Sequence, residues 1–136
     1  MDFGNFGTVS FTNQSKAAPF VEYLAQGKFM ATKCTKCGEK FFPPRLDCPN
    51  CLDSNITWFE IKSRGKLITY TTVNYGPLGF ENDAPYSLGI VEFEEGVKVL
   101  SRISKEIDPN DIKIGMQLKV VPISLGNDKV SYELQL

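Results

Sequence analysis

The sequence of 136 residues contains no histidine. Without an imidazole, neither a Ser-His-Asp group nor a Cys-His pair can form, and a catalytic zinc site with histidine ligands is excluded. The side chain that most often serves as a general base near neutral pH is also missing. Carboxylates remain, but no Asp/Glu pair stands out from the surface charge. The sequence therefore favours a protein that is not an enzyme.

The sequence also lacks three other features: an excess of charge of one sign, a long apolar run and a basic N-terminal segment. Fifteen Lys and Arg against sixteen Asp and Glu give a net charge of −1, a poor match for non-specific binding to nucleic acid. No apolar run approaches the ~20 residues that a membrane helix needs. Residues 1–5 lack the basic and apolar regions of a signal peptide. We expect a cytoplasmic protein that binds no membrane.

Cysteine is rare as well, and its spacing is informative. The four cysteines follow the pattern C-x2-C-x10-C-x2-C, as Cys34, Cys37, Cys48 and Cys51. Two such turns brought together place four thiolates at the corners of a tetrahedron, which is the geometry of a structural zinc site with Zn–S distances of about 2.3 Å. Four protein ligands leave no position for water or substrate. We therefore expect a structural Zn²⁺ that takes no part in chemistry.

Two disulfides or a redox pair are the alternatives to a metal. Disulfides are typical of short, cysteine-dense secreted chains, and a redox C-x2-C usually occurs once, so the doubled spacing favours zinc. Residue type does not distinguish zinc from iron. Gly38 follows Cys37 and suits a tight turn, because glycine tolerates positive φ. Leu52 follows Cys51, so the second turn is expected to be less tight.

Apolar periodicity predicts one short helix and a chain that is otherwise mainly β. In residues 19–26, Phe20, Tyr23 and Leu24 form one helical face behind Pro19, which suits the first helical position. Residues 1–17 are interpreted as an arm that carries Phe3, Phe6 and Phe11. A small hairpin that joins the two cysteine pairs completes a zinc ribbon.

From residue 61 onward the pattern is entirely β. Five strands are predicted, with a short helical break at 108–112 between the third and the fourth: 66–73, 87–93, 97–103, 117–123 and 129–136. This order predicts a five-stranded OB-fold barrel. Gly89, within a strand, indicates a bend or bulge. We divide the chain into an arm and helix (1–27), a zinc ribbon (28–60) and an OB-fold domain (61–136).

The order of these segments resembles the acyl-CoA-associated family that pairs a rubredoxin-like zinc ribbon with a C-terminal OB-fold, long catalogued as domain of unknown function 35. The resemblance covers about residues 18–125, and the C-P-x-C after Pro43-Pro44-Arg45 is its most specific part. The matching stretches are 19–20, 34–38, 42–45, 48–51, 65–71, 84–91 and 114–116.

The resemblance implies association and not catalysis. Proteins of this family, especially in archaea, are companions of thiolases and of 3-hydroxy-3-methylglutaryl-CoA (HMG-CoA) synthase of the mevalonate pathway. They are thought to bridge two enzymes and to hold the pantetheine arm of acyl-CoA between them. The resemblance therefore implies a non-catalytic scaffold that binds acyl-CoA.

Acyl-CoA needs basic and aromatic side chains for its head and a narrow apolar groove for its arm. The loop from Tyr75 to Phe80 is long and apolar, and basic residues lie on the ribbon and at the junction with the barrel. An alternative is that Tyr75 and Phe80 cap the barrel and that the basic residues are solvated. The candidate ligand residues are Arg45, Arg64, Lys66, Tyr75, Leu78, Phe80 and Tyr86.

Two other functions stay open at this point. Zinc ribbons and OB-folds also occur in proteins that bind single-stranded nucleic acid, which requires aromatic platforms and a basic groove. Aromatic residues make up 12% of the chain, but its acidic balance opposes this function. An enzyme that acts on acyl thioesters is the third hypothesis, and the missing histidine opposes it.

Overall fold

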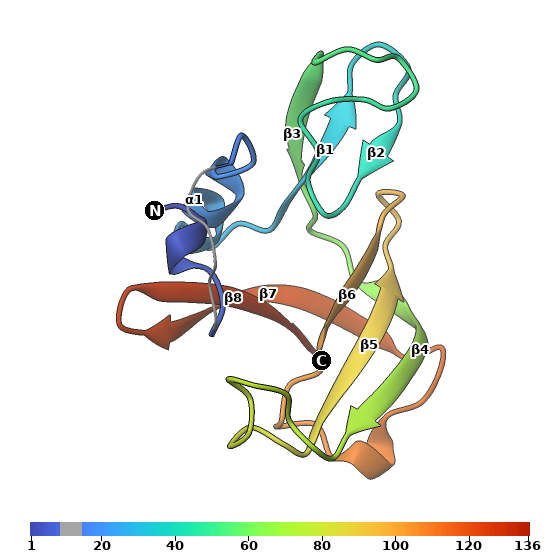
Figure 1. Cartoon of the computed structure of the whole chain (residues 1–136). Helices are drawn as coiled ribbons and strands as arrows, with labels where there is room; N and C mark the ends of the chain where they lie inside the picture. The colour runs from blue at the N-terminus through green and yellow to red at the C-terminus, as the bar shows by residue number, and fades with distance from the viewer. Residues whose placement is uncertain (9–14) are drawn as a thin grey trace.

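The computed structural model describes residues 1–8 and 15–136, which form two antiparallel sheets, one in a ribbon and one in a barrel (Figure 1). The predicted fold class is confirmed: mainly β, with one short α-helix, a four-cysteine ribbon and a five-stranded OB-fold. Of the phenylalanines assigned to the arm, Phe11 lies outside the described residues. No helix in the described part of the chain has the length and apolar character to cross a membrane.

The ribbon is a three-stranded sheet in the order β2-β1-β3. Its strands are β1 (Met30–Cys34), β2 (Lys40–Phe41) and β3 (Ile56–Glu60). The central strand carries the buried Thr32, whose hydroxyl accepts a hydrogen bond of 3.0 Å from the backbone N–H of Arg45. This bond fixes the segment that leads from the first cysteine pair to the second.

The barrel follows the OB arrangement. Its strands are β4 (Gly65–Val73), β5 (Tyr86–Glu92), β6 (Lys98–Arg102), β7 (Gln117–Gly126) and β8 (Lys129–Gln135), in the order β6-β5-β4-β7-β8. A parallel bridge between Ile103 and Leu134 joins β6 to β8 and closes the barrel. The 3₁₀ helix η2 (Pro109–Asp111) lies between β6 and β7, where the short helical break was predicted.

The barrel strands change register near Ile68 in β4 and between Ser124 and Gly126 in β7, but not at Gly89. Gly89 pairs regularly with Tyr70 and with Ser101, whereas β4 changes register between Leu67 and Thr69. A Cβ at residue 89 would lie 2.8 Å from Leu67 Cδ1 and 3.1 Å from Ile103 Cδ1. Glycine therefore lets the Leu67 and Ile103 side chains pack closely against the backbone there, and the predicted bulge at this position is wrong.

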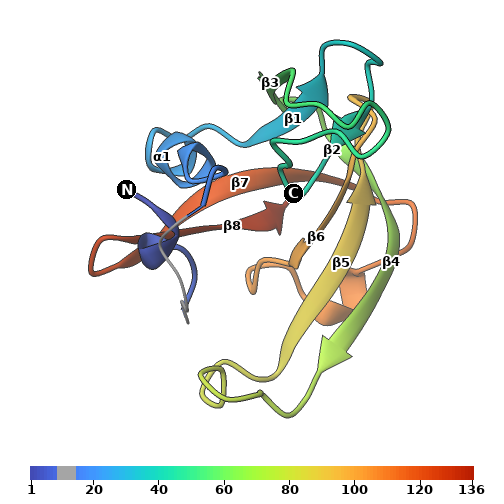
Figure 2. The ribbon, with the colours of Figure 1, turned by 45° about the horizontal axis from the view of Figure 1, so that its top comes forward.

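Helix α1 (Pro19–Ala25) and the 3₁₀ helix η1 (Phe3–Asn5) cover one side of β7 and β8 (Figure 2). Phe20 is 3% exposed and lies at the centre of an aromatic cluster. Its ring centroid is 5.9 Å from that of Phe29 in the ribbon segment and 6.0 Å from that of Tyr132 in β8. The arm joins the same cluster through Phe3 and Phe6. Helix, ribbon and barrel therefore share one hydrophobic core.

A second contact joins ribbon and barrel at the turn between β5 and β6. The carboxylate of Glu95 accepts hydrogen bonds of 3.0 and 3.2 Å from the backbone N–H groups of Lys62 and Ser63, and one from the Ser63 hydroxyl. Burial alone would raise the pKa of Glu95, but the bonds from Ser63 and Lys62 outweigh it, so that the pKa lies below its ordinary value of 4.5. The linker between the two sheets is held by this carboxylate.

Candidate functional site

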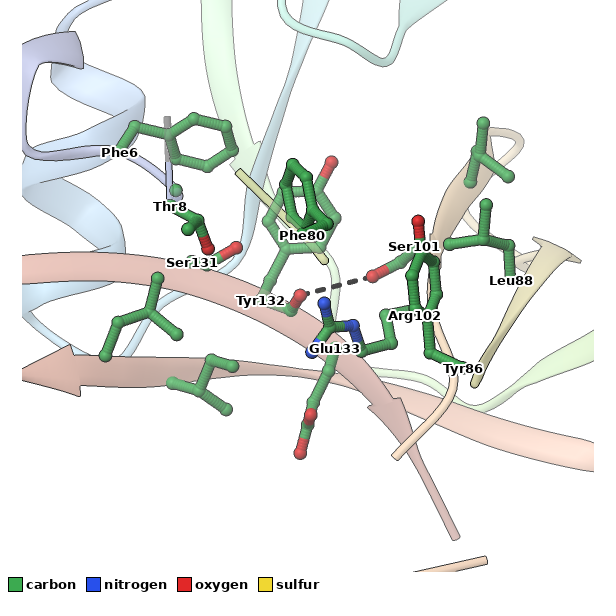
Figure 3. A pocket seen from close by; sticks show the side chains of 14 residues that line it. Phe6, Thr8, Phe80, Tyr86, Leu88, Ser101, Arg102, Ser131, Tyr132 and Glu133 are labelled. Carbon is green, nitrogen blue, oxygen red and sulfur yellow. Dashed lines mark hydrogen bonds between the residues drawn. The ribbon is translucent and has the colours of Figure 1, made fainter. Parts of the chain in front are cut away.

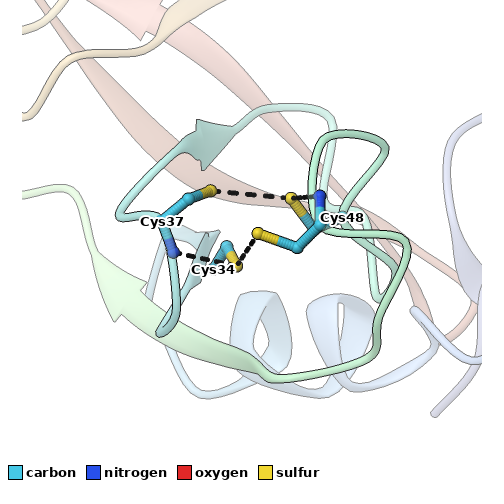
Figure 4. Close-up of side chains that lie close together, drawn as sticks. Cys34, Cys37 and Cys48 are labelled. Carbon is cyan, nitrogen blue, oxygen red and sulfur yellow. Dashed lines mark hydrogen bonds between the residues drawn. The ribbon is translucent and has the colours of Figure 1, made fainter.

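The four cysteine side chains meet at the tip of the ribbon, as their spacing predicted (Figure 4). Their sulfur atoms all lie within 4.8 Å of one another. The Cys34 and Cys51 sulfurs are 3.9 Å apart, and those of Cys37 and Cys48 are 3.7 Å apart. A tetrahedron with metal–sulfur bonds of about 2.3 Å has edges of about 3.8 Å, so the cluster fits a four-thiolate metal centre.

Both cysteine turns have the same internal hydrogen bonds. The N–H of Cys37 donates to the Cys34 sulfur at 3.5 Å, and the N–H of Cys51 donates to the Cys48 sulfur at 3.4 Å. Leu52 has a φ of 53° and Gly38 has a φ of 80°, so both residues adopt the left-handed conformation. The expectation of a looser second turn is therefore wrong: the turn closes with leucine in the left-handed region.

Without a bound cation, the surroundings of the cluster do not allow all four cysteines to be thiolates at once. The Cys37 backbone amide lowers the pKa of Cys34 to about 7, whereas the neighbouring Cys37 thiol and burial raise that of Cys51 to about 12. The Cys51 amide lowers the pKa of Cys48, but burial and the thiols of Cys37 and Cys34 outweigh it, and the pKa is raised overall. A divalent ion among the sulfurs reverses this balance, because coordinating thiols are deprotonated.

A separate groove lies between the outer face of β5–β6 and the hairpin of β7 and β8, with a volume of about 340 Å³. Figure 3 shows side chains of β8 and the arm on one side and those of β5 and β6 on the other, with Phe80 between them. Most of its lining is apolar or aromatic: Phe6, Phe80, Tyr86, Leu88, Leu100, Ile123, Leu125 and Tyr132. Burial raises the pKa of Tyr132 to about 12, so its hydroxyl stays protonated.

Arg102 is the cationic side chain among the residues that line this groove. Its guanidinium carbon lies 4.9 Å from the centroid of the Tyr86 ring, and Nη2 donates to Asp83 Oδ2 at 3.2 Å. In Figure 3 the guanidinium projects from the β6 side toward Glu133 on β8. A guanidinium has five N–H donors, so Asp83 positions the group and leaves donors for an anion in the groove.

The predicted ligand residues do not gather in one place. Phe80 and Tyr86 line the groove, with ring centroids 6.4 Å apart. Tyr75 and Leu78 lie on the same loop as Phe80, but they are 92% and 89% exposed.

The three predicted basic residues lie elsewhere. Arg45 lies on the ribbon, with its guanidinium carbon 6.0 Å from the centroid of the Phe41 ring. Arg64 and Lys66 share a small hollow with Glu92 and Glu94. Sequence reasoning missed Arg102, because an outward position in an alternating strand is usually solvated, and it missed Leu88 and Leu100 for the same reason.

Two known families match consecutive parts of the chain. Residues 21–57 match the family described as the ChsH2 rubredoxin-like zinc ribbon domain, and residues 58–121 match the ChsH2 C-terminal OB-fold domain. A DUF35 domain-containing scaffold protein of Pyrococcus furiosus is 39% identical over 69% of this chain and 68% of its own length.

Two further relatives carry names that refer to enzyme complexes. The benzoylsuccinyl-CoA thiolase subunit BbsA of Thauera aromatica is 28% identical over 52% of this chain and 48% of its own. A solved structure named Ltp2-ChsH2(DUF35) aldolase superposes with a TM-score of 0.77 over 92% of this chain and 98% of its own, at 22% identity. At that identity the superposition supports the fold alone.

Proposed function

Because this chain belongs to the DUF35/ChsH2 family of zinc-ribbon and OB-fold proteins, we propose that it is a non-catalytic scaffold protein that holds acyl-CoA beside thiolase-type and HMG-CoA-synthase-type enzymes. The cysteine cluster binds structural Zn²⁺ in this proposal. The relatives named as a scaffold protein and as a thiolase subunit support the assignment.

The observation that carries the proposal is the apolar groove with one arginine. Its volume falls at the lower end of the range of about 300–1,000 Å³ that small-molecule sites occupy. The apolar walls suit the thin pantetheine arm, and the aromatic rings of Phe80 and Tyr86 extend that surface. Arg102 offers a planar fork of donors, which suits a phosphate of the CoA molecule.

A scaffold role also agrees with the chemistry of the groove. Its polar side chains in the described residues are Thr8, Tyr86, Ser101, Arg102, Ser131, Tyr132 and Glu133. The Ser101 hydroxyl donates to the backbone carbonyl of Tyr132 at 3.2 Å, and a carbonyl is not a general base that could activate it as a nucleophile. The groove can bind and orient a thioester, and the reacting groups are supplied by a second protein.

Calorimetric titration of CoA and acetyl-CoA tests the proposal, with this chain alone and with a co-purified thiolase-type enzyme. We expect saturable binding that Arg102→Gln weakens about tenfold, as loss of one charge-assisted bond predicts. Arg64→Gln, in the hollow shared with Glu92 and Glu94, is the matched control and should leave the affinity unchanged. Absence of CoA binding in both settings would refute the proposal, and so would acyl-CoA turnover by the pure chain.

A further inference from the structure

The N-terminal arm contacts the edge of β8 at the point where the barrel opens. Strand β8 has β7 on one side, and on its other side parallel bridges join Leu134 to Ile103 and Val130 to Phe6. The backbone N–H of Gly7 donates to the Val130 carbonyl at 2.9 Å. Near its C-terminal end β8 therefore contacts the end of β6, whereas near its N-terminal end it contacts the arm. The groove lies between these two neighbours of β8.

Two further contacts hold the arm in this position. The side-chain amide of Asn5 donates to the carbonyl of Asp128, in the turn between β7 and β8, at 3.0 Å. The Asp2 carboxylate caps η1, because it accepts a hydrogen bond of 2.8 Å from the N–H of Gly4. The course of the arm is therefore defined both by the barrel and by its own short helix.

Phe6 contacts the groove, whereas Phe3 does not. Both rings pack near Phe20, with centroid distances of 6.4 Å for Phe3 and 6.0 Å for Phe6, but of the two only Phe6 lines the groove. Its ring stays half-buried although it also lies 6.0 Å from the ring of Tyr132. Figure 3 shows Phe6 on the arm side of the groove, while Arg102 projects from the β6 side. The exposed surface of Phe6 therefore faces the space that a ligand fills.

We propose that residues 6–8 are part of the acyl-CoA site, with the Phe6 ring packed against the bound pantetheine arm, so that ligand binding and docking of the N-terminal arm stabilise each other. This role rests on the proposed function and adds the arm to it. A ligand that contacts both β6 and the arm binds tightly only when the arm is docked. By linkage, the ligand then stabilises the docked arm by the same factor.

The two sides of the groove suit different parts of the ligand. On one side, the rings of Phe6 and Tyr132 form an aromatic wall for the thin apolar chain. The hydroxyls of Thr8 and Ser131 lie on the same side and can bond the amide groups of that chain. Arg102 on the other side suits the phosphate. A ligand held by both sides spans the distance from β6 to the arm.

Calorimetric titration of CoA into the full zinc-loaded chain, alone or with its co-purified enzyme, tests the contribution of Phe6. We expect Phe6→Ala to weaken binding about tenfold, as the loss of a half-buried aromatic contact predicts. Phe6→Leu keeps an apolar side chain and should weaken binding less than about threefold.

Tyr23→Ala is the matched control, since it also removes a half-buried aromatic ring. The Tyr23 ring packs on Trp58, with centroids 5.5 Å apart, and does not line the groove, so the affinity for CoA should be unchanged. Zinc content and thermal unfolding establish that each variant is folded.

Amide exchange in the unmodified chain tests the coupling without any substitution. The Gly7 N–H, bonded to the Val130 carbonyl, exchanges with solvent when the arm leaves β8, so its rate, measured by NMR, reports docking. Saturating CoA should slow this exchange about tenfold, because the coupling is reciprocal. If CoA binds but either the Gly7 exchange rate or the affinity of Phe6→Ala is unchanged, the arm has no such role and the proposed function stands. If CoA binds in neither setting, both proposals are wrong.

Discussion

Gly38 and Leu52 occupy equivalent positions in the two cysteine turns. Each follows the second cysteine of its pair, each has a positive φ, and each donates a backbone hydrogen bond of 2.9 or 2.8 Å to the carbonyl of the first cysteine. Glycine adopts this conformation without cost, whereas the left-handed region costs an L-residue roughly 1–2 kcal/mol. The second turn therefore contains strain that the first does not.

Replacing Leu52 by glycine should stabilise the ribbon. The substitution removes the left-handed strain but adds conformational entropy to the unfolded chain, so we expect a net gain of about 0.5 kcal/mol. Gly38→Ala is the matched opposite change. A Cβ there meets nothing within 4 Å, so the loss of about 1 kcal/mol comes from the backbone alone. Thermal unfolding of the zinc-loaded proteins measures the stability change of both variants. A Leu52→Gly variant less stable than the parent would contradict the claim that Leu52 is strained.

Removing one ligand should release the metal and unfold the ribbon tip while the barrel persists. The cluster Cys34, Phe41 and Cys48, with Cys51 and Ile56 against it, is separate from the main core, and structural zinc supplies roughly 10–16 kcal/mol to small modules. Phe29 and Ala31 belong to the main core and should stay protected. Hydrogen exchange of Cys51→Ser should show rapid exchange in residues 34–56 only. Protection that persists there without metal would refute a structural role.

Zinc affinity should rise steeply with pH. In the metal-free protein the pKa of Cys51 is about 12 and that of Cys48 is raised above 9.0. Both thiols are therefore protonated at neutral pH, and each must lose its proton when the ion binds. Chelator competition from about pH 6 to about pH 8 should give a slope of at least two protons per zinc. A pH-independent affinity would show that the thiols are ionised before the metal arrives.

Glu95→Gln should loosen the attachment of the ribbon to the barrel. We expect a loss of about 1–2 kcal/mol, because an amide accepts fewer of the bonds from Lys62 and Ser63. The folded-state pKa of Glu95 is lowered from 4.5, so its contribution is present above that pH and disappears as the pH falls through the folded-state value. The free energies of unfolding of the parent and of Glu95→Gln, measured with denaturant, should therefore become equal as the pH is lowered. Lys98→Gln, at an exposed ion pair with Glu92, is a suitable control.

The sequence was sufficient for the elements that depend on local patterns. Strand β6 alternates the buried Val99 and Ser101 with the outward Lys98 and Leu100, and a period of two identifies such a strand. The cysteine cluster was equally predictable, because the ligands of a structural zinc site occur at characteristic spacings along the sequence. Leu52 shows the limit of this reasoning: residue type gives a local preference, but the hydrogen bonds of the turn override it.

The groove was beyond such reasoning because it depends on contacts between distant segments. Arg102 and Tyr132 become neighbours only after Ile103 and Leu134 have closed the barrel. Nothing local in the sequence marks that closure. The same dependence on distant contacts explains why the three predicted basic residues do not line the groove. Arg45, Arg64 and Lys66 have side chains that could bind a phosphate, but the topology places them on other parts of the surface.

The double attachment of ribbon to barrel, through Phe20 on one side and Glu95 on the other, has a mechanical consequence. Because the ribbon contacts the barrel at two separate points, the two sheets cannot rotate relative to each other about a single hinge. We therefore expect them to move as one rigid body. The orientation of the cysteine cluster therefore fixes the orientation of the barrel that carries Arg102. A protein that bound the cysteine-bearing tip would therefore also fix the orientation of the barrel.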